Sequence, residues 1–114
     1  MDRPLTVSEQ RRLKLDDELR EIQMDVLGYE HTYFDPPEKV RMQYDAIVYT
    51  KITLDVKRAN NKTYLKRDGY QITVISRDSE SPMPGAIQDH FSLCSPGKPF
   101  KSNNLCHFPF TIFY

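Results

Sequence analysis

Residues 70–76 read YQITVIS, and residues 108–114 read FPFTIFY. Both stretches are rich in β-branched and aromatic side chains and alternate in side-chain character, which is typical of strands. The segment between them contains Pro82 and Pro84, which suit the opening of a short helix and cannot continue a strand. The pattern therefore predicts a strand, a short helix and a terminal strand, with Pro109 marking an edge or a bulge in the last one.

Residues 6–28 have the pattern of one amphipathic helix. Thr6 and Ser8 are candidate N-caps, and Gly28 is a suitable C-terminal stop. Charged residues cover most of the helix, but apolar residues recur at steps of four, three and four. They form one stripe, which consists of Leu15, Leu19, Ile22 and Val26. We expect this stripe to face the core, and docking of a partner against the helix is an alternative use.

The middle of the chain predicts further strands. Residues 29–34 are a candidate for a short strand, residues 46–57 form a β-rich stretch whose second half alternates, and residues 63–65 form a weak strand. Pro36 and Pro37 require a turn or an extended loop after the first of these strands. The sequence SPGKP at residues 95–99 predicts another loop.

The order of these elements, α-β-β-β-α-β, predicts an α+β fold in a single domain over residues 1–114. We expect a small antiparallel β-sheet, with the long N-terminal helix and the second short helix packed on one face. The residues predicted to be largely buried are Leu19, Ile22, Val26, Ile72, Val74, Ile87 and Phe110.

Length and charge argue against several classes of function. The chain has 114 residues, and its 16 basic and 16 acidic residues cancel. General binding to phosphate backbones relies on an excess of Lys and Arg, so it is not expected here. No apolar run approaches the roughly 18 residues that a membrane helix needs, and the first residues lack the apolar core of a secretion signal. We expect synthesis in the cytoplasm and no membrane association.

The residues that could carry chemistry are scattered. Cys94, Cys106, His107 and His90 are the nominal donors for a metal, but no Cys-x-x-Cys pair or two-His helical spacing connects them. No glycine-rich phosphate loop and no serine elbow is present in the sequence. We therefore predict two reduced cysteines, no metal, no cofactor and no enzymatic activity.

One basic concentration lies at residues 57–62 and 66–67, around Tyr64. Cations interleaved with an aromatic ring can form a platform for single-stranded nucleic acid. A charged hairpin end that protects a sheet edge from aggregation is the other interpretation. The balanced charge of the whole chain favours the second one.

Residues 44–49 (YDAIVY), 54–62 (LDVKRANNK), 70–81 (YQITVISRDSES) and 103–114 (NNLCHFPFTIFY) together resemble small tail-completion proteins of long-tailed bacteriophages. The resemblance covers about residues 27–114 and depends on the order and spacing of these stretches. Phe108, Pro109 and the loop at 95–99 depart from it, because a more polar and aromatic segment is expected there. These departures concern the last strand and its loop.

The resemblance implies a tail terminator of the virion neck. Such a subunit closes with copies of itself into a ring, usually a hexamer, on the head-proximal end of the tail tube. Its other partners would be the tail tube protein and the head connector or stopper protein, and DNA would pass the ring without sequence-specific binding. The candidate contact residues are polar loop residues beside sheet edges: Asn60, Asn61, Lys62, Tyr64, Asn103 and Asn104.

Two alternatives stay open. A head-closure or stopper protein of the same neck region is expected to be a small β-barrel without a long N-terminal helix, so the apolar stripe at residues 8–27 favours the terminator. A small non-viral module that binds protein or nucleic acid is the other alternative, and DNA retention that falls with salt would identify it.

Overall fold

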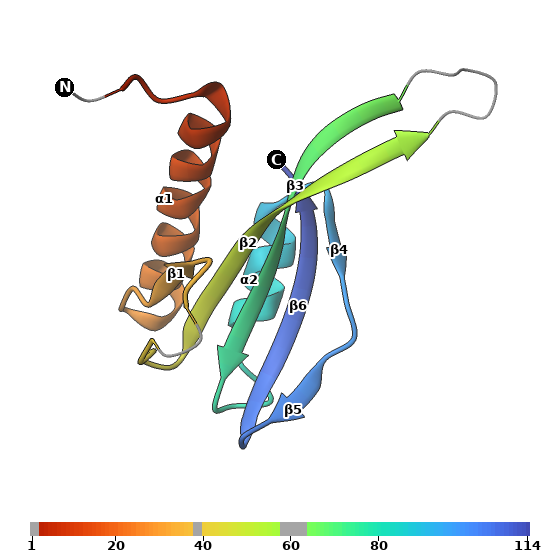
Figure 1. The fold of residues 1–114 in the computed structure, drawn as a ribbon. Helices are drawn as coiled ribbons and strands as arrows, with labels where there is room; N and C mark the ends of the chain where they lie inside the picture. Colours follow the sequence, from red (N-terminus) through yellow and green to blue (C-terminus); the bar gives the residue numbers. More distant parts are fainter. Residues whose placement is uncertain (1–2, 38–39, 58–63) are drawn as a thin grey trace.

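The computed structural model describes residues 3–37, 40–57 and 64–114, with the backbone alone described at 53–57 and 64–68. This part of the chain forms two helices and a mixed sheet of six strands, so the predicted α+β class is confirmed (Figure 1).

Helix α1 spans Val7–Leu27 and is bounded by two capping motifs. Thr6, rather than Ser8, is the N-cap: its hydroxyl accepts a hydrogen bond from the Glu9 N–H, and the Glu9 carboxylate accepts one from the Thr6 N–H. At the other end, Gly28 has a φ of 82° and donates its N–H to the Met24 carbonyl at 2.9 Å. Glycine adopts this left-handed conformation without steric cost, which explains why the helix ends there.

The strands follow the order β1-β2-β3-β6-β4, and β5 also pairs with β6. Their bounds are β1 Thr32–Phe34, β2 Ala46–Lys57, β3 Tyr64–Ser76, β4 Cys94–Pro96, β5 Phe100–Ser102 and β6 Leu105–Phe113. Strand β3 is the centre of the sheet and is longer than the predicted 70–76, because it continues through the weak strand predicted at 63–65. The predicted strands at 46–50 and 52–57 likewise form one continuous strand.

The prediction of a purely antiparallel sheet is wrong at one edge. Strand β1 pairs with β2 in parallel, with Thr32 opposite Ile47 and Phe34 opposite Tyr49. The chain between these strands includes Pro36 and Pro37 and returns to the starting end of β1, which a parallel pair requires. The other strand pairs are antiparallel.

The predicted loop at 95–99 is also wrong in part. Strands β4 and β5 lie on either side of a short interruption at Gly97, and both pair with the outer edge of β6. Pro109 lies opposite this interruption, where its carbonyl accepts a hydrogen bond from the Gly97 N–H at 2.8 Å. A Cβ on Gly97 would lie 3.0 Å from the ring of Pro109, so the close approach favours glycine. The predicted irregularity at Pro109 is therefore a break in the neighbouring edge strand.

The core forms between one face of the sheet and both helices. Tyr49, Ile72 and Phe110 lie side by side on that face, in register across β2, β3 and β6. Helix α2, Met83–His90, adds Met83 and Ile87. Of the seven residues predicted to be buried, the structure confirms Leu19, Ile22, Ile72, Val74, Ile87 and Phe110, whereas Val26 is partly exposed.

Polar side chains fix α1 against the parallel edge of the sheet. Gln23 is fully buried, its amide N–H donates to the Asp45 carbonyl at 2.9 Å, and its amide oxygen accepts from the His31 N–H at 2.6 Å. Asp16 accepts hydrogen bonds from Arg20 and from the Tyr49 hydroxyl. These bonds satisfy polar groups that would otherwise be buried without partners.

Candidate functional site

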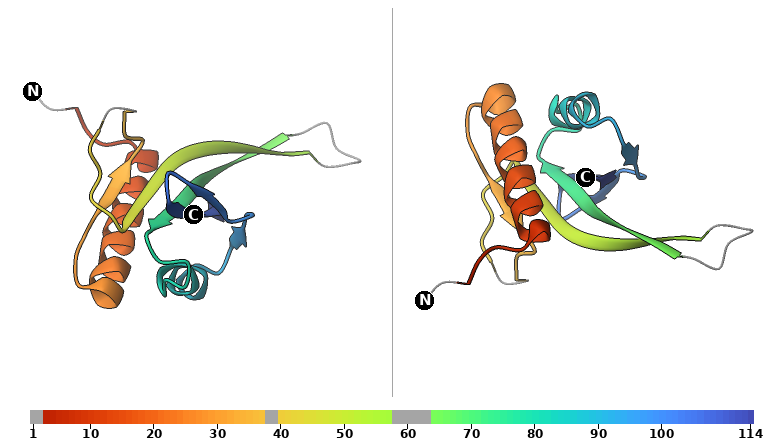
Figure 2. Two further views of the ribbon diagram at one scale, coloured as in Figure 1. Left: turned by 90° about the horizontal axis from the view of Figure 1, so that it is seen from below. Right: turned by 90° about the horizontal axis from the view of Figure 1, so that it is seen from above.

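The hairpin of β2 and β3 is longer than the sheet that supports it. The two strands pair from Ala46 opposite Ile75 out to Lys57 opposite Tyr64. Among the residues that the structure describes, β6 pairs with β3 only from Gly69 to Ser76, and β1 pairs with β2 only from Ile47 to Tyr49. The outer part of the hairpin, residues 53–57 and 64–68, therefore projects as a two-stranded ribbon, which we call the arm (Figures 1 and 2).

The arm presents two sheet edges. In the part of the chain that the structure describes, the strands of the arm pair only with each other. In an antiparallel pair, alternate residues direct their N–H and C=O groups away from the partner strand. Such an edge is a template for pairing with another chain, and a two-stranded ribbon alone is marginally stable. The arm is therefore suited to strand addition by a partner.

The predicted contact residues fall at opposite ends of the sheet. Tyr64 is the first residue of β3 at the arm, whereas Asn103 and Asn104 connect β5 to β6 near the other end of β3. A strand of 13 residues spans about 40 Å. One copy of the chain therefore does not gather these residues into one surface. Asn60, Asn61 and Lys62 lie outside the described residues.

Asn103 and Asn104 have a structural role as well. They form a two-residue turn between Ser102 and Leu105, with φ values of 52° and 63°. This is the conformation of a type I′ hairpin, in which asparagine is favoured because it tolerates positive φ. Both side chains are exposed, so they are accessible to a partner.

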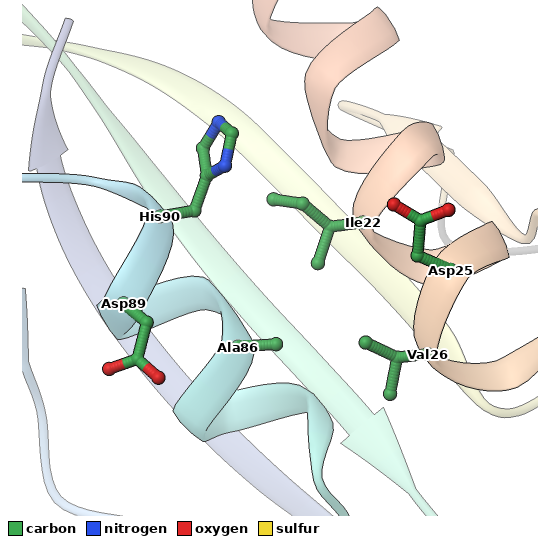
Figure 3. Close-up of a pocket in the computed structure, with 6 residues that line it drawn as sticks. All are labelled: Ile22, Asp25, Val26, Ala86, Asp89 and His90. Atoms are coloured by element: carbon green, nitrogen blue, oxygen red, sulfur yellow. The ribbon is translucent and has the colours of Figure 1, made fainter.

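A groove between α1 and α2 is a further candidate surface that the sequence did not reveal. It has a volume of about 320 Å³ and is lined by Ile22, Asp25, Val26, Ala86, Asp89 and His90. Figure 3 shows the apolar side chains of Ile22, Val26 and Ala86 between the two helices, with Asp25 on α1 and with Asp89 and His90 on α2 around them. The groove thus has an apolar floor and an acidic rim.

A polar cluster connects the helices to the end of the chain beside this groove. Glu18 of α1 lies 3.4 Å from His90 Nε2 of α2 and accepts a hydrogen bond from the Tyr114 hydroxyl. Burial and the hydrogen bond to Glu18 raise the pKa of the Tyr114 phenol above its usual value. The cluster holds α1, α2 and the last residue together and so fixes the width of the groove.

The cysteines and histidines do not form a site. Cys94 lies opposite Ile112 on β6, six positions from Cys106, which corresponds to about 20 Å along the strand. A disulfide needs Cα atoms within about 7 Å, and both cysteines are free. Burial raises the pKa of the Cys94 thiol, which lowers its reactivity. Across residues 3–37, 40–52 and 69–114, no three His, Cys, Asp or Glu side chains are placed to hold a metal ion.

No described helix is both long enough and apolar enough to cross a membrane. No protein-family model matches this sequence, and a comparison with curated proteins also finds no match. The fold and its surfaces define an open-sheet α+β domain with a projecting hairpin arm and an acidic interhelical groove.

Proposed function

We propose that this protein is a tail terminator of a long-tailed bacteriophage. It would form a ring of six copies on the head-proximal end of the tail tube, stop tube growth and join the tail to the head connector in the virion neck. The resemblance of residues 27–114 to tail-completion proteins supports this proposal. The main structural observation in its favour is the projecting arm of β2 and β3.

The arm suits ring formation for a physical reason. A ring requires a heterologous contact, in which one surface of each subunit meets a different surface of the next. Addition of a strand to an exposed edge provides such a contact through main-chain hydrogen bonds. The arm offers edges of this kind at one end of the molecule, away from the helices (Figure 2).

The remaining features are compatible with a ring through which DNA passes. The chain carries 16 basic and 16 acidic residues, so its net charge does not retain DNA. The Asn103–Asn104 turn lies at the opposite end of the sheet from the arm. In the proposed ring, the arm would contact the neighbouring copy, whereas the Asn103–Asn104 turn would face the tail tube protein or the connector or stopper.

Addition of the purified protein to growing tail tubes tests the proposal. The protein should bind one end of each tube and block elongation, as seen by electron microscopy and by tube length. A variant in which a two-residue Asn-Gly turn replaces residues 53–68 should lose this activity. Binding along the tube wall, or no effect on elongation, would contradict the proposed function.

A second variant tests the turn at the other end of the sheet. Asn103→Gly/Asn104→Gly keeps a backbone that tolerates positive φ and removes only the amide side chains. Tail or connector joining should weaken in this variant, whereas its thermal stability should change little. Unchanged joining would exclude these side chains from the contact.

In the phage, deletion of the gene should leave DNA-filled heads beside unattached tails of abnormal length. The stopper alternative predicts tails of normal length and heads that leak DNA. The long α1 and the open sheet favour the terminator over a barrel-shaped stopper. Normal joined virions from the deletion would exclude both neck functions.

A further inference from the structure

The surface of α1 carries its charges in two separate blocks. One stripe runs along a flank of the helix at steps of four and three residues, and it consists of Val7, Arg11, Lys14, Glu18, Glu21 and Asp25. All of these residues except the half-buried Glu18 are exposed. Residues three and four apart are neighbours on a helix. The first half of the stripe is therefore apolar and basic, and the second half is acidic.

This arrangement is unfavourable within a single chain. Acidic residues near a helix C-terminus oppose the helix dipole, and the last turn of α1 contains no basic residue. Glu21 lies four positions from both Asp17 and Asp25, and like charges at this spacing repel. Among the described residues, none of the ion pairs includes Arg11, Lys14, Glu21 or Asp25. These charges are thus available to another molecule.

The basic block lies beside exposed apolar side chains, and the acidic block lies beside the apolar floor of the groove. Near the basic block, Leu5 is 49% and Val7 65% exposed. Near the acidic block, Ile22, Val26 and Ala86 form the floor of the interhelical groove, and Asp25 and Asp89 form its rim (Figure 3). We call the first surface, Leu5, Val7, Arg11 and Lys14, the basic end. We call the second, Ile22, Asp25, Val26, Ala86 and Asp89, the acidic groove.

The two surfaces complement each other in charge and both contain aliphatic side chains, but one chain cannot join them. Arg11 and Asp25 are separated by about 20 Å along a straight helix. We infer that the acidic groove of one copy binds the basic end of α1 from a second copy, so that copies associate head to tail. The inference rests on the proposed function, because it names a second contact in the proposed ring.

A head-to-tail contact fits the surfaces better than a symmetric pair of α1 helices. An antiparallel α1 pair along the stripe would also oppose basic and acidic blocks, but it would leave Ala86 and Asp89 of α2 uncovered. Insertion of Leu5 and Val7 into the groove covers its apolar floor and places Arg11 and Lys14 near the rim carboxylates. Such a contact is heterologous, so it propagates from copy to copy and can close into a ring where the rotation between copies allows it.

Neutral substitutions test the contact with little risk to the fold, because the changed side chains are exposed. The basic-end variant is Arg11→Gln/Lys14→Gln, and the groove variant is Asp25→Asn/Asp89→Asn. The matched control, Glu30→Gln/Glu80→Gln, removes two exposed acidic charges elsewhere. Loss of Asp25 relieves repulsion from Glu21, so weaker association of the groove variant cannot be attributed to a weaker helix.

Sedimentation velocity up to millimolar concentration, with native mass spectrometry, gives the size of the complexes. The wild type and the control should form species larger than dimers at low salt, and high salt should weaken them. Each variant alone should associate at least tenfold more weakly. An equimolar mixture of the two variants should associate more strongly than either variant alone, because the intact groove of the basic-end variant can meet the intact basic end of the groove variant.

Several outcomes would overturn the inference. They are a wild type that stays monomeric or stops at a dimer, association that the two variants leave unchanged, and a mixture that associates no more strongly than either variant alone. Tube capping separates this inference from the proposed function. If the two variants cap tubes as well as the wild type, the proposed function is supported without this contact. If the wild type associates as described but does not cap tubes, the contact is supported and the proposed function is wrong.

Discussion

Strand β3 has two halves whose surroundings differ completely. From Gly69 to Ser76 it lies between β2 and β6, and its inner face is covered by the helices. From Tyr64 to Asp68 it pairs with β2 alone, as far as the described residues go. The comparison shows that one strand can belong to a packed body and to an unsupported ribbon. We call the part of the sheet that the helices cover, with the helices themselves, the body. Substitutions in the body should therefore change stability most, and changes in the arm should mainly affect association.

The largest expected effect is in the body, at Ile72. This side chain is fully buried between Tyr49 and Phe110. Ile72→Ala should lower the free energy of unfolding by about 2–5 kcal/mol, because it removes buried methyl groups and leaves a cavity. Urea unfolding measures the change. The control Leu93→Ala, at a residue that is 49% exposed, should change it by less than about 1 kcal/mol.

Gln23 tests the polar attachment of α1 to the edge of the body. Gln23→Ala should lower the free energy of unfolding by about 1–3 kcal/mol, because the His31 N–H and the Asp45 carbonyl would lose their buried partner. The exposed Gln88→Ala is the matched control on α2 and should have little effect on the urea midpoint. Equal effects of the two substitutions would contradict the role of Gln23.

A smaller effect is expected at the start of α1. Thr6→Ala should lower the free energy of unfolding by about 1 kcal/mol, because the Glu9 N–H loses the hydroxyl that caps it. Thr6→Ser keeps the hydroxyl and should retain most of the stability. Thermal unfolding followed by circular dichroism compares the three chains, and an equal loss in both variants would exclude the capping bond as the cause.

The same cap should respond to acid. Hydrogen bonds from Arg3 and from the Thr6 backbone lower the pKa of Glu9 from 4.5 to about 2. Because the pKa of Glu9 is lower in the folded chain, the ionised Glu9 carboxylate stabilises the fold above pH 4.5. This stabilisation is lost as the pH falls toward 2. The stability difference between the wild type and Glu9→Gln should therefore shrink over this range. A difference that is independent of pH would contradict the lowered pKa.

The smallest effect on stability is expected from the arm. Replacement of residues 53–68 by an Asn-Gly turn between Ile52 and Gly69 keeps every strand pair of the body. The free energy of unfolding should change by less than about 1 kcal/mol, although tube capping should be lost. Amide hydrogen exchange in the wild type should likewise be faster in the arm than at Ile72. A large loss of stability would show that the arm belongs to the packed body.

The correct predictions concern features that nearby residues specify. The apolar stripe and Gly28 predicted α1, and the prolines at 82 and 84 predicted α2. The alternation around Ile72 and Phe110 predicted the buried face of the sheet. In each case, periodicity, a cap or a proline acts within a few residues, so its effect is visible in the local sequence.

The wrong or missing predictions concern partners that are distant in the sequence. Strands β4 and β5 exist because the outer edge of β6 is available to pair with them, although their composition is that of a loop. Nothing near residues 32–34 shows that they pair in parallel with β2. The acidic groove is likewise formed by residues from two helices, so neither segment reveals it alone.

By itself, the sequence determined which segments are helical or extended and which side chains are buried in the core, because local propensity and periodicity carry that information. Only the tertiary structure decided which edges are covered, where the arm begins and how α1 and α2 enclose a groove. These features depend on which distant segments meet, and pairing and packing across the chain are set by the fold as a whole.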